Sequence, residues 1–236
     1  MEQIRNISVL LFTTAALFSV INPLFKSRSD EHGPVEELTH YNPPPEIKER
    51  IKSLPIVKHV ENIENIEIRP FVLPNPRQFI RGKMLHKEEG IEIAQSQYSK
   101  MDQTVVVFLQ LGHSLTGHPG IIHGGLISAL FDDIMGEMFY SHTERKYFGF
   151  TASLKIDYRK PMESGQVIAF CVKITEQKER KIYIKGAAFN AEENLVFGDG
   201  TGMFEKFVGK ATLYSEAESL YIIPKDSWEK YKALHQ

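Results

Sequence analysis

The sequence predicts an α+β fold in which an antiparallel, curved sheet wraps around one buried helix. A strongly apolar stretch from about residue 123 to 141 has the period of a helix, and strand-like segments separated by short polar turns follow it. Hydrophobic residues make up 42% of the 236 residues, which is enough for a substantial core. The length suits one domain with an appendage.

The predicted central helix has two different faces when its residues are placed at 100° steps. One face is wide and apolar. The other is small rather than charged, and Asp132 lies on it among Ser128, Ala129 and Gly136. Because small side chains let another backbone approach closely, we expect a partner subunit to cover this face and Asp132 to lie at the edge of a subunit interface. The apolar face consists of Leu126, Ile127, Leu130, Phe131, Ile134 and Met138.

Strand-like segments lie on both sides of this helix. They are rich in β-branched and aromatic residues, and the turns "KPMESGQ", "QKERK" and "AEEN" between the later segments are short and polar, as antiparallel hairpins require. The sequence therefore predicts a meander of three or four strands after the helix. The expected strands are 78–85, 91–99 and 103–112 before the helix, and 147–159, 166–177, 181–191 and 195–207 after it.

The N-terminus does not look like part of the folded domain. Residues 7–25 carry no charge, and nineteen residues of helix span about 28 Å, close to the hydrocarbon thickness of a bilayer. The segment is interpreted as a single-pass anchor with a transmembrane helix, a cleaved secretory signal or a mitochondrial targeting segment. Lysine and arginine residues on its two sides give little indication of orientation.

The rest of the chain is divided by composition. A hydrophobic anchor or targeting segment at 1–25 is followed by a linker at 26–76, which is rich in Gly and Pro and contains one short helix in "PEIKERIKSLP". The folded domain is expected at 77–213, and a C-terminal helical tail at 214–236.

Composition excludes several functional classes. The net charge is −2 and no basic cluster is present, so a nucleic-acid partner is not expected. The single cysteine, Cys171, excludes a disulfide within the chain and a cysteine-rich zinc site, and its apolar surroundings predict burial. His113, His118 and His123 recur every five residues, but no acid or cysteine stands at ligand spacing, so no metal site is predicted.

The stretch "GIIHGGLISALFDDIMG" resembles the His-Gly-Gly motif of hotdog-fold acyl-CoA thioesterases of the PaaI-like and mammalian superfamily-member-4 type. In that motif six residues separate His-Gly-Gly from an Asp, and a Gly follows four positions later. A second block, "TASLKIDYRKPMESG", resembles the strand that follows the helix in this family, and "GDGTGMF" resembles its last strand. The matching motif positions are His123, Gly124, Gly125, Asp132 and Gly136.

This resemblance implies a hotdog fold, at least a dimer, and hydrolysis of an acyl-CoA thioester to a free fatty acid and CoA without a cofactor. It implies that Asp132 acts as general base or nucleophile and that the amide of Gly124 forms an oxyanion hole at the helix N-terminus, with the site at a dimer interface. Thr151 would position water or the second oxygen of Asp132 across that interface. Eukaryotic relatives of this type are often mitochondrial, so we expect a mitochondrial protein associated with the membrane through residues 7–25, with a secretory-pathway membrane as the alternative.

Four further residues near the motif blocks have an expected role in the site: Gly125, His123, Arg159 and Lys160. Gly125 would let the thioester carbonyl approach the backbone, because it has no Cβ. His123 would take part in the chemistry or hydrogen-bond the loop at the helix start. Arg159 and Lys160 would bind the phosphates of CoA by charge.

Two other functions remain open on the sequence. A hotdog dehydratase or hydratase would pair a loop histidine, His118, with Asp132. A non-catalytic hotdog protein would bind acyl-CoA or a partner protein. The acyl chain length, and the choice between a homodimer and a dimer of dimers, also stay open.

Overall fold

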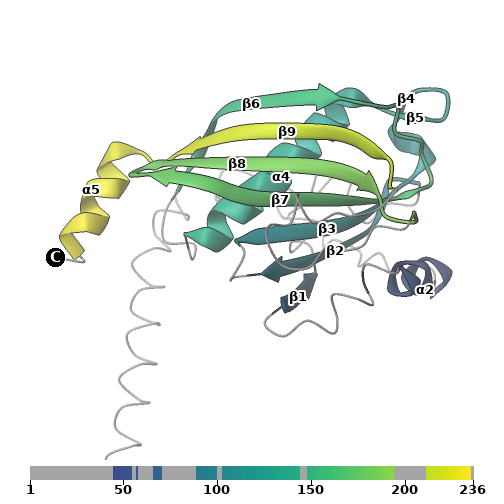
Figure 1. Cartoon of the computed structure of the whole chain (residues 1–236), viewed down its shortest axis with the longest axis horizontal. Helices are drawn as coiled ribbons and strands as arrows, with labels where there is room; N and C mark the ends of the chain where they lie inside the picture. The colour runs from purple at the N-terminus through teal and green to yellow at the C-terminus, as the bar shows by residue number, and fades with distance from the viewer. Residues whose placement is uncertain are drawn as a thin grey trace, which may run out of the picture. The chain divides into compact units, whose positions relative to one another are not determined.

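The computed structural model describes residues 45–54, 57, 66–70, 89–99, 103–143, 148–193 and 211–234. The predicted hotdog architecture is confirmed, since a curved antiparallel sheet of seven strands lies against one long helix, α4 (Gly124–His142) (Figure 1). The strands are β1 (Ile66–Pro70), β2 (Ile91–Ser99), β3 (Thr104–Leu111), β6 (Phe150–Tyr158), β7 (Val167–Lys178), β8 (Lys181–Asn190) and β9 (Leu213–Ile222). Their order in the sheet is β1-β2-β3-β7-β8-β9-β6, and every pairing is antiparallel.

A compact loop region leads into α4. It contains the 3₁₀ turn η2 (His113–Leu115) and a small two-stranded ribbon of β4 (Thr116–His118) and β5 (Ile121–Ile122). The backbone of Ile122 donates to the carbonyl of Met162, 2.8 Å away, which ties this ribbon to the turn between β6 and β7. The start of α4 is therefore held against the end of the sheet at which β6 finishes.

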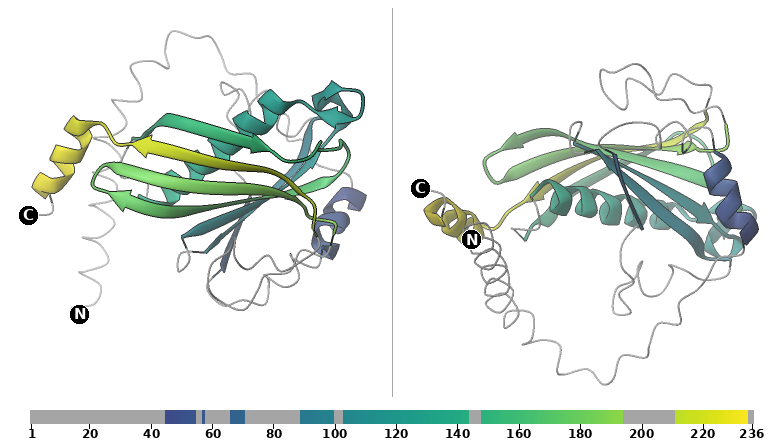
Figure 2. Two further views of the ribbon diagram at one scale, coloured as in Figure 1. Left: turned by 45° about the horizontal axis from the view of Figure 1, so that its top comes forward. Right: turned by 90° about the horizontal axis from the view of Figure 1, so that it is seen from below.

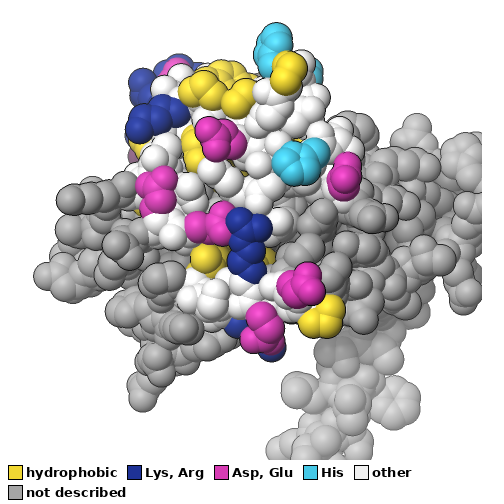
Figure 3. Space-filling model, turned by 90° about the vertical axis from the view of Figure 1, so that its right-hand side faces the viewer, with side chains coloured by type: hydrophobic (Ala, Val, Ile, Leu, Met, Phe, Trp, Pro, Cys, Tyr) yellow, Lys and Arg dark blue, Asp and Glu magenta, His cyan; other side chains and the backbone are white. Residues whose placement is uncertain are grey.

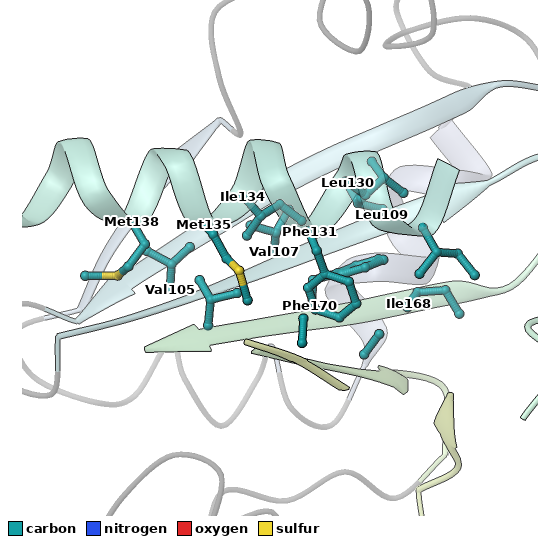
Figure 4. Packing of buried hydrophobic residues seen from close by; sticks show 14 of the residues in the cluster. Val105, Val107, Leu109, Leu130, Phe131, Ile134, Met135, Met138, Ile168 and Phe170 are labelled. Carbon is teal, nitrogen blue, oxygen red and sulfur yellow. The ribbon is translucent and has the colours of Figure 1, made fainter. Parts of the chain in front are cut away.

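The apolar face predicted for α4 is buried against the concave face of the sheet (Figures 2 and 4). Phe131 meets Phe170 of β7 edge to face, with ring centroids 5.1 Å apart. A Cβ at Gly186 of β8 would lie 2.7 Å from Met135 Cε and 2.9 Å from Phe131 Cε1, so glycine lets the helix come close to this strand. Helix period and close packing together fix which face of α4 turns away from the sheet.

A second apolar cluster covers the other face of the sheet. The helix α2 (Pro45–Ser53) and the residues after it bury Ile51, Leu54 and Val57 against β3 and β7. The whole of β3 is therefore buried, which explains why "TVVVFLQL" does not alternate between apolar and polar residues. Cys171 belongs to this cluster and is buried, as its apolar surroundings predicted.

The short helix α2 is also held by polar contacts. The Arg50 guanidinium donates to Glu192 Oε1 at 2.6 Å and to the carbonyl of Gly165 at 3.1 Å. These contacts join the N-terminal extension to the end of the sheet at which β7 begins. The extension is thus more than a linker from Pro45 onwards, and the expected boundary of the folded part at residue 77 is wrong, because β1 also pairs with β2.

The expected helical tail at 214–236 is also wrong in its first half. Residues Leu213–Ile222 form β9, and only Lys225–Leu234 form a helix, α5. Half of this strand is Ser, Glu or Ala and the other half is Leu, Tyr or Ile, so its local preference does not decide between strand and helix. Pairing with β8 on one side and β6 on the other decides its structure. The expected strands 78–85 and 195–207 lie outside the described residues, as does the segment 7–25. Within the described part of the chain, no helix is both long and apolar enough to cross a bilayer.

Candidate active site

Asp132 lies in the middle of α4, and two hydroxyl groups from the sheet contact it. Thr151 Oγ1 donates to Asp132 Oδ1 at 2.7 Å. The Tyr221 hydroxyl donates to the backbone carbonyl of Asp132 at 2.8 Å and lies 3.4 Å from Oδ1. The carboxylate is therefore fixed against β6 and β9, although it lies on a helix face without large side chains.

The contact between Thr151 and Asp132 forms within one chain. The expectation that Thr151 reaches Asp132 across a subunit interface is wrong for this contact, because β6 lies beside α4 of the same chain. Thr151 and Tyr221 are partners in the register of β6 and β9. Since paired residues on neighbouring strands point to the same face of a sheet, both side chains reach the same residue of α4.

The N-terminus of α4 is capped by the histidine of the motif. His123 has extended backbone angles, φ −63° and ψ 126°, and its Nδ1 accepts from the amide of Gly125 at 2.9 Å. The amides of Leu126 and Ile127 donate to the carbonyl of His123 at 2.9 and 3.1 Å. Among the described residues, the amide of Gly124 has no acceptor within the chain, so it is the helix-start donor left for a ligand.

This geometry changes the explanation for Gly125. A Cβ at Gly125 would lie 2.9 Å from His123 Cε1 and 3.0 Å from Nδ1. The glycine is therefore required by the folded-back histidine cap, and its amide is already used. The capping contact also gives His123 a structural role, while its direct part in the chemistry stays a prediction.

Gly124 and Asp132 do not belong to one local site in a single chain. They are eight residues apart on α4, which separates them by about 12 Å along the axis. One thioester carbonyl group is too small to touch both. A site that uses both residues therefore needs two helices.

Tyr158, at the end of β6, was not singled out on the sequence. Its hydroxyl donates to the carbonyl of Gly124 at 2.8 Å and lies 2.7 Å from Ser128 Oγ. The side chain is 54% exposed and lies over the first turn of α4. Its only signal was its place as the Tyr of the "YRKP" block, and the spacing of that block gives no indication of the helix it contacts.

The two basic residues after Tyr158 differ from each other. Arg159 Nε donates to Glu216 Oε2 at 2.7 Å, whereas Lys160 is exposed. Their role in binding CoA phosphates stays a prediction, with Arg159 already engaged in an ion pair. The end of the molecule that carries β4 and β5 presents histidine, basic and acidic side chains together with an apolar patch (Figure 3).

The other loop histidines are not assembled with these residues into a metal site. His113 Nδ1 lies 2.7 Å from Ser164 Oγ, and His118 is an exposed residue of β4. Over the residues that the structure describes, no group of three or more His, Cys, Asp and Glu side chains is arranged to hold a metal ion.

Comparison with known proteins finds a similarity to thioesterases in this region. Residues 119–197 match the model of the thioesterase superfamily. Acyl-coenzyme A thioesterase THEM4 of Rattus norvegicus is 29% identical over 130 residues, which cover 55% of this chain and 54% of that protein. The uncharacterized mitochondrial membrane protein FMP10 of Saccharomyces cerevisiae is 25% identical over 151 residues, or 63% of this chain and 61% of that protein.

The chain spans about half the length of the THEM4 proteins of rat and mouse that it matches. A solved structure of a hypothetical thioesterase with coenzyme A from Streptococcus pneumoniae is 20% identical, with a TM-score of 0.41, over 52% of this chain and 80% of that one. The stretch that matches the thioesterase superfamily model, residues 119–197, contains the His-Gly-Gly turn, Asp132 and Thr151.

Proposed function

We propose that this protein hydrolyses an acyl-CoA thioester to a free fatty acid and CoA, at a site shared by two copies of the chain. The observation that carries the proposal is that the two functional groups lie at different positions along α4. The carboxylate of Asp132 is fixed by Thr151 in the middle of the helix. The amide of Gly124 lies at the helix start, about 12 Å away, and has no acceptor among the residues that the structure describes. The name of the THEM4 relatives supports acyl-CoA as the substrate class.

The proposed reaction uses few groups. Asp132 acts as a general base on water, or attacks the carbonyl carbon itself, and negative charge develops on the carbonyl oxygen. The Gly124 amide of the partner subunit receives that charge, together with the positive end of the helix dipole, and one such donor contributes about 3 kcal/mol. The C–S bond then breaks, and the CoA thiolate leaves without needing a strong acid because it is a weak base. Where Asp132 itself has attacked, water then hydrolyses the acyl anhydride on Asp132 and releases the fatty acid.

The open edge of β6 supports the proposed dimer. At this end of the described sheet β6 pairs with β9 alone, and three large apolar side chains are exposed on or beside it: Phe148 at 48%, Phe150 at 67% and Tyr158 at 54%. Edge strands of this kind readily pair with a second strand. Pairing of two β6 strands would bury these rings and bring the small face of α4 close to the second copy.

We further propose that CoA binds at the end of β6. Lys160 is exposed there, next to the Arg159–Glu216 ion pair, whose side chains are 52% and 45% exposed. A CoA phosphate would bind the Lys160 ammonium directly and would compete with the Glu216 carboxylate for the Arg159 guanidinium. Gly125 contributes through the helix start that it shapes rather than through its own amide.

The proposed location is the mitochondrion. Residues 7–25 would associate the protein with a membrane, and residues 26–44 would connect that segment to the folded domain. The names of two relatives support this: the yeast relative is a mitochondrial membrane protein, and a relative in Candida albicans is a mitochondrial protein. A fluorescent fusion with and without residues 1–25 tests it. Loss of mitochondrial signal in the shortened form is expected, and unchanged location would contradict the proposal.

Thiol release from acyl-CoA, measured with a chromogenic thiol reagent over chain lengths from acetyl to palmitoyl, tests the activity. We expect release by the wild type and almost none by Asp132→Asn, with His118→Ala close to wild type. Loss on His118→Ala would instead favour a dehydratase, which pairs that histidine with Asp132. No release at any chain length would leave a binding protein as the function.

A further inference from the structure

Tyr221 is the residue near Asp132 that the sequence did not indicate. It lies on β9, 89 positions after Asp132, and its hydroxyl contacts both the backbone carbonyl and the carboxylate of that residue, at 2.8 and 3.4 Å. The rest of its ring is packed in the core, where it stacks on Phe139 with centroids 5.3 Å apart. A phenylalanine would fill the same volume, so packing alone does not require the hydroxyl.

Gly136 allows this contact. It follows Asp132 by one helical turn, and a Cβ placed there would lie 3.4 Å from the Tyr221 hydroxyl oxygen. That is at the short limit of normal contact, so any larger side chain would push the phenol away from the helix. The glycine that completes the spacing of the motif is thus explained by the approach of a tyrosine from β9.

The hydroxyl is suited to act as a permanent donor. Tyr221 is buried, with 3% of its surface exposed, and burial raises the pKa of its phenol well above the usual value. The negative charge of Asp132 adds to this effect. The phenol therefore keeps its proton throughout the pH range in which the enzyme would work, and it stays a hydrogen-bond donor to Asp132.

We propose that Tyr221 is a positioning residue that, together with Thr151, holds Asp132 in its reactive orientation. The two hydroxyls act from neighbouring strands on one residue: Thr151 fixes Oδ1, and Tyr221 fixes the main chain that carries it. Both carboxylate contacts fall on Oδ1, so Oδ2 is the oxygen that turns to the substrate or to water. This inference rests on the proposed thioesterase function.

The test compares Tyr221→Phe with Tyr214→Phe in the full chain. Tyr214 is a matched control, because it is also a buried tyrosine of β9, and its hydroxyl donates to Gln166 instead of Asp132. We expect Tyr221→Phe to lower kcat about tenfold with KM changed less than about twofold, since a contact that orients the carboxylate acts on the reaction step. Tyr214→Phe should keep the wild-type kcat, and thermal unfolding measures the stability of both.

A double-mutant cycle separates positioning from packing. If Tyr221 and Thr151 act through Asp132, the losses on Tyr221→Phe and Thr151→Val will not multiply when combined. Gly136→Val is a second route, because it retains the tyrosine while a side chain larger than a methyl group displaces its hydroxyl, and we expect about a fivefold loss of kcat from it. This variant keeps the inference testable if Tyr221→Phe does not fold.

Two results would overturn the inference. One is equal kcat for Tyr221→Phe and Tyr214→Phe. The other is a rise in KM without a fall in kcat, which would make Tyr221 a substrate contact. An active Asp132→Asn variant is a different failure, because it would remove the proposed function itself and would be seen before any tyrosine variant is made.

Discussion

Replacing Thr151 by valine removes one hydrogen bond from the proposed catalytic carboxylate. Valine keeps the shape of threonine and suits a strand, so β6 should be unaffected. The lost contact is the 2.7 Å bond to Asp132 Oδ1, and a hydrogen bond to a charged group contributes about 1.5–3 kcal/mol. Thr151 is exposed in the single chain, so we use the lower part, about 1.5–2 kcal/mol. This predicts a fall in kcat of about 10- to 30-fold.

The assay is steady-state release of CoA thiol by wild type, Thr151→Val and Thr151→Ser. Serine keeps a hydroxyl at the same position, so its kcat should stay within about threefold of wild type. The free energy of unfolding of Thr151→Val should fall by no more than about 2 kcal/mol, the value of the lost hydrogen bond, and that of Thr151→Ser should stay close to wild type. Wild-type kcat in Thr151→Val would refute the idea that this hydroxyl orients Asp132. Equal losses in the serine and valine variants would refute it as well.

Three further predictions concern the packing and capping contacts that hold the helices and the sheet together. Ile51→Ala should lower the free energy of unfolding by about 2–4 kcal/mol, because Ile51 is buried between α2 and the sheet. Urea denaturation measures this, and an unchanged free energy of unfolding would mean that α2 does not pack there. His123→Ala should lower the free energy of unfolding by about 1 kcal/mol through loss of the helix cap, and His123→Asn should recover most of that loss. Equal stability of the alanine and asparagine variants would show that the cap is absent. Cys171 should not react with a thiol reagent in the native protein and should react fully in denaturant, since burial raises its pKa well above 9.0. The stability that the buried thiol contributes is complete below its unfolded-state pKa and is lost as pH rises through the higher folded-state pKa. Rapid labelling of Cys171 in the native protein at pH 8 would contradict its burial.

The sequence predicted the central helix well, because its apolar residues recur at helical spacing over the whole segment. The expected range 123–141 became α4, Gly124–His142, and strands rich in β-branched residues, such as β3, were also found in place. The motif positions Asp132 and Thr151 are in contact, but within one chain and not across the subunit interface that the family resemblance implied. Local periodicity and motif spacing carry this information directly.

Other parts could not be read from local patterns. β9 has a mixed composition that does not distinguish a strand from a helix, and its partners β8 and β6 determine its structure. Tyr221 reaches Asp132 only through the register of those strands, which no spacing along the chain encodes. The cap made by His123 differs, since it is a contact between residues 123 and 125, and a histidine followed by two glycines at a helix start was a readable signal.

The shared site can be tested by mixing two inactive variants. Asp132→Asn lacks the carboxylate. Gly124→Pro removes the amide hydrogen and adds a ring at the helix start, and the helix should still form. Position 124 is the first residue of α4, where proline is tolerated, and His123 before it has extended angles that proline accepts. Each variant alone should be inactive.

Activity after subunit exchange between these two variants is the most direct measurement of the central claim. Random pairing gives half mixed dimers, each with one intact site, so about a quarter of the wild-type activity should return. No recovery, in a mixture whose mixed dimers are verified by differently tagged chains, would show that each chain uses its own Gly124 and would contradict a site divided between two copies.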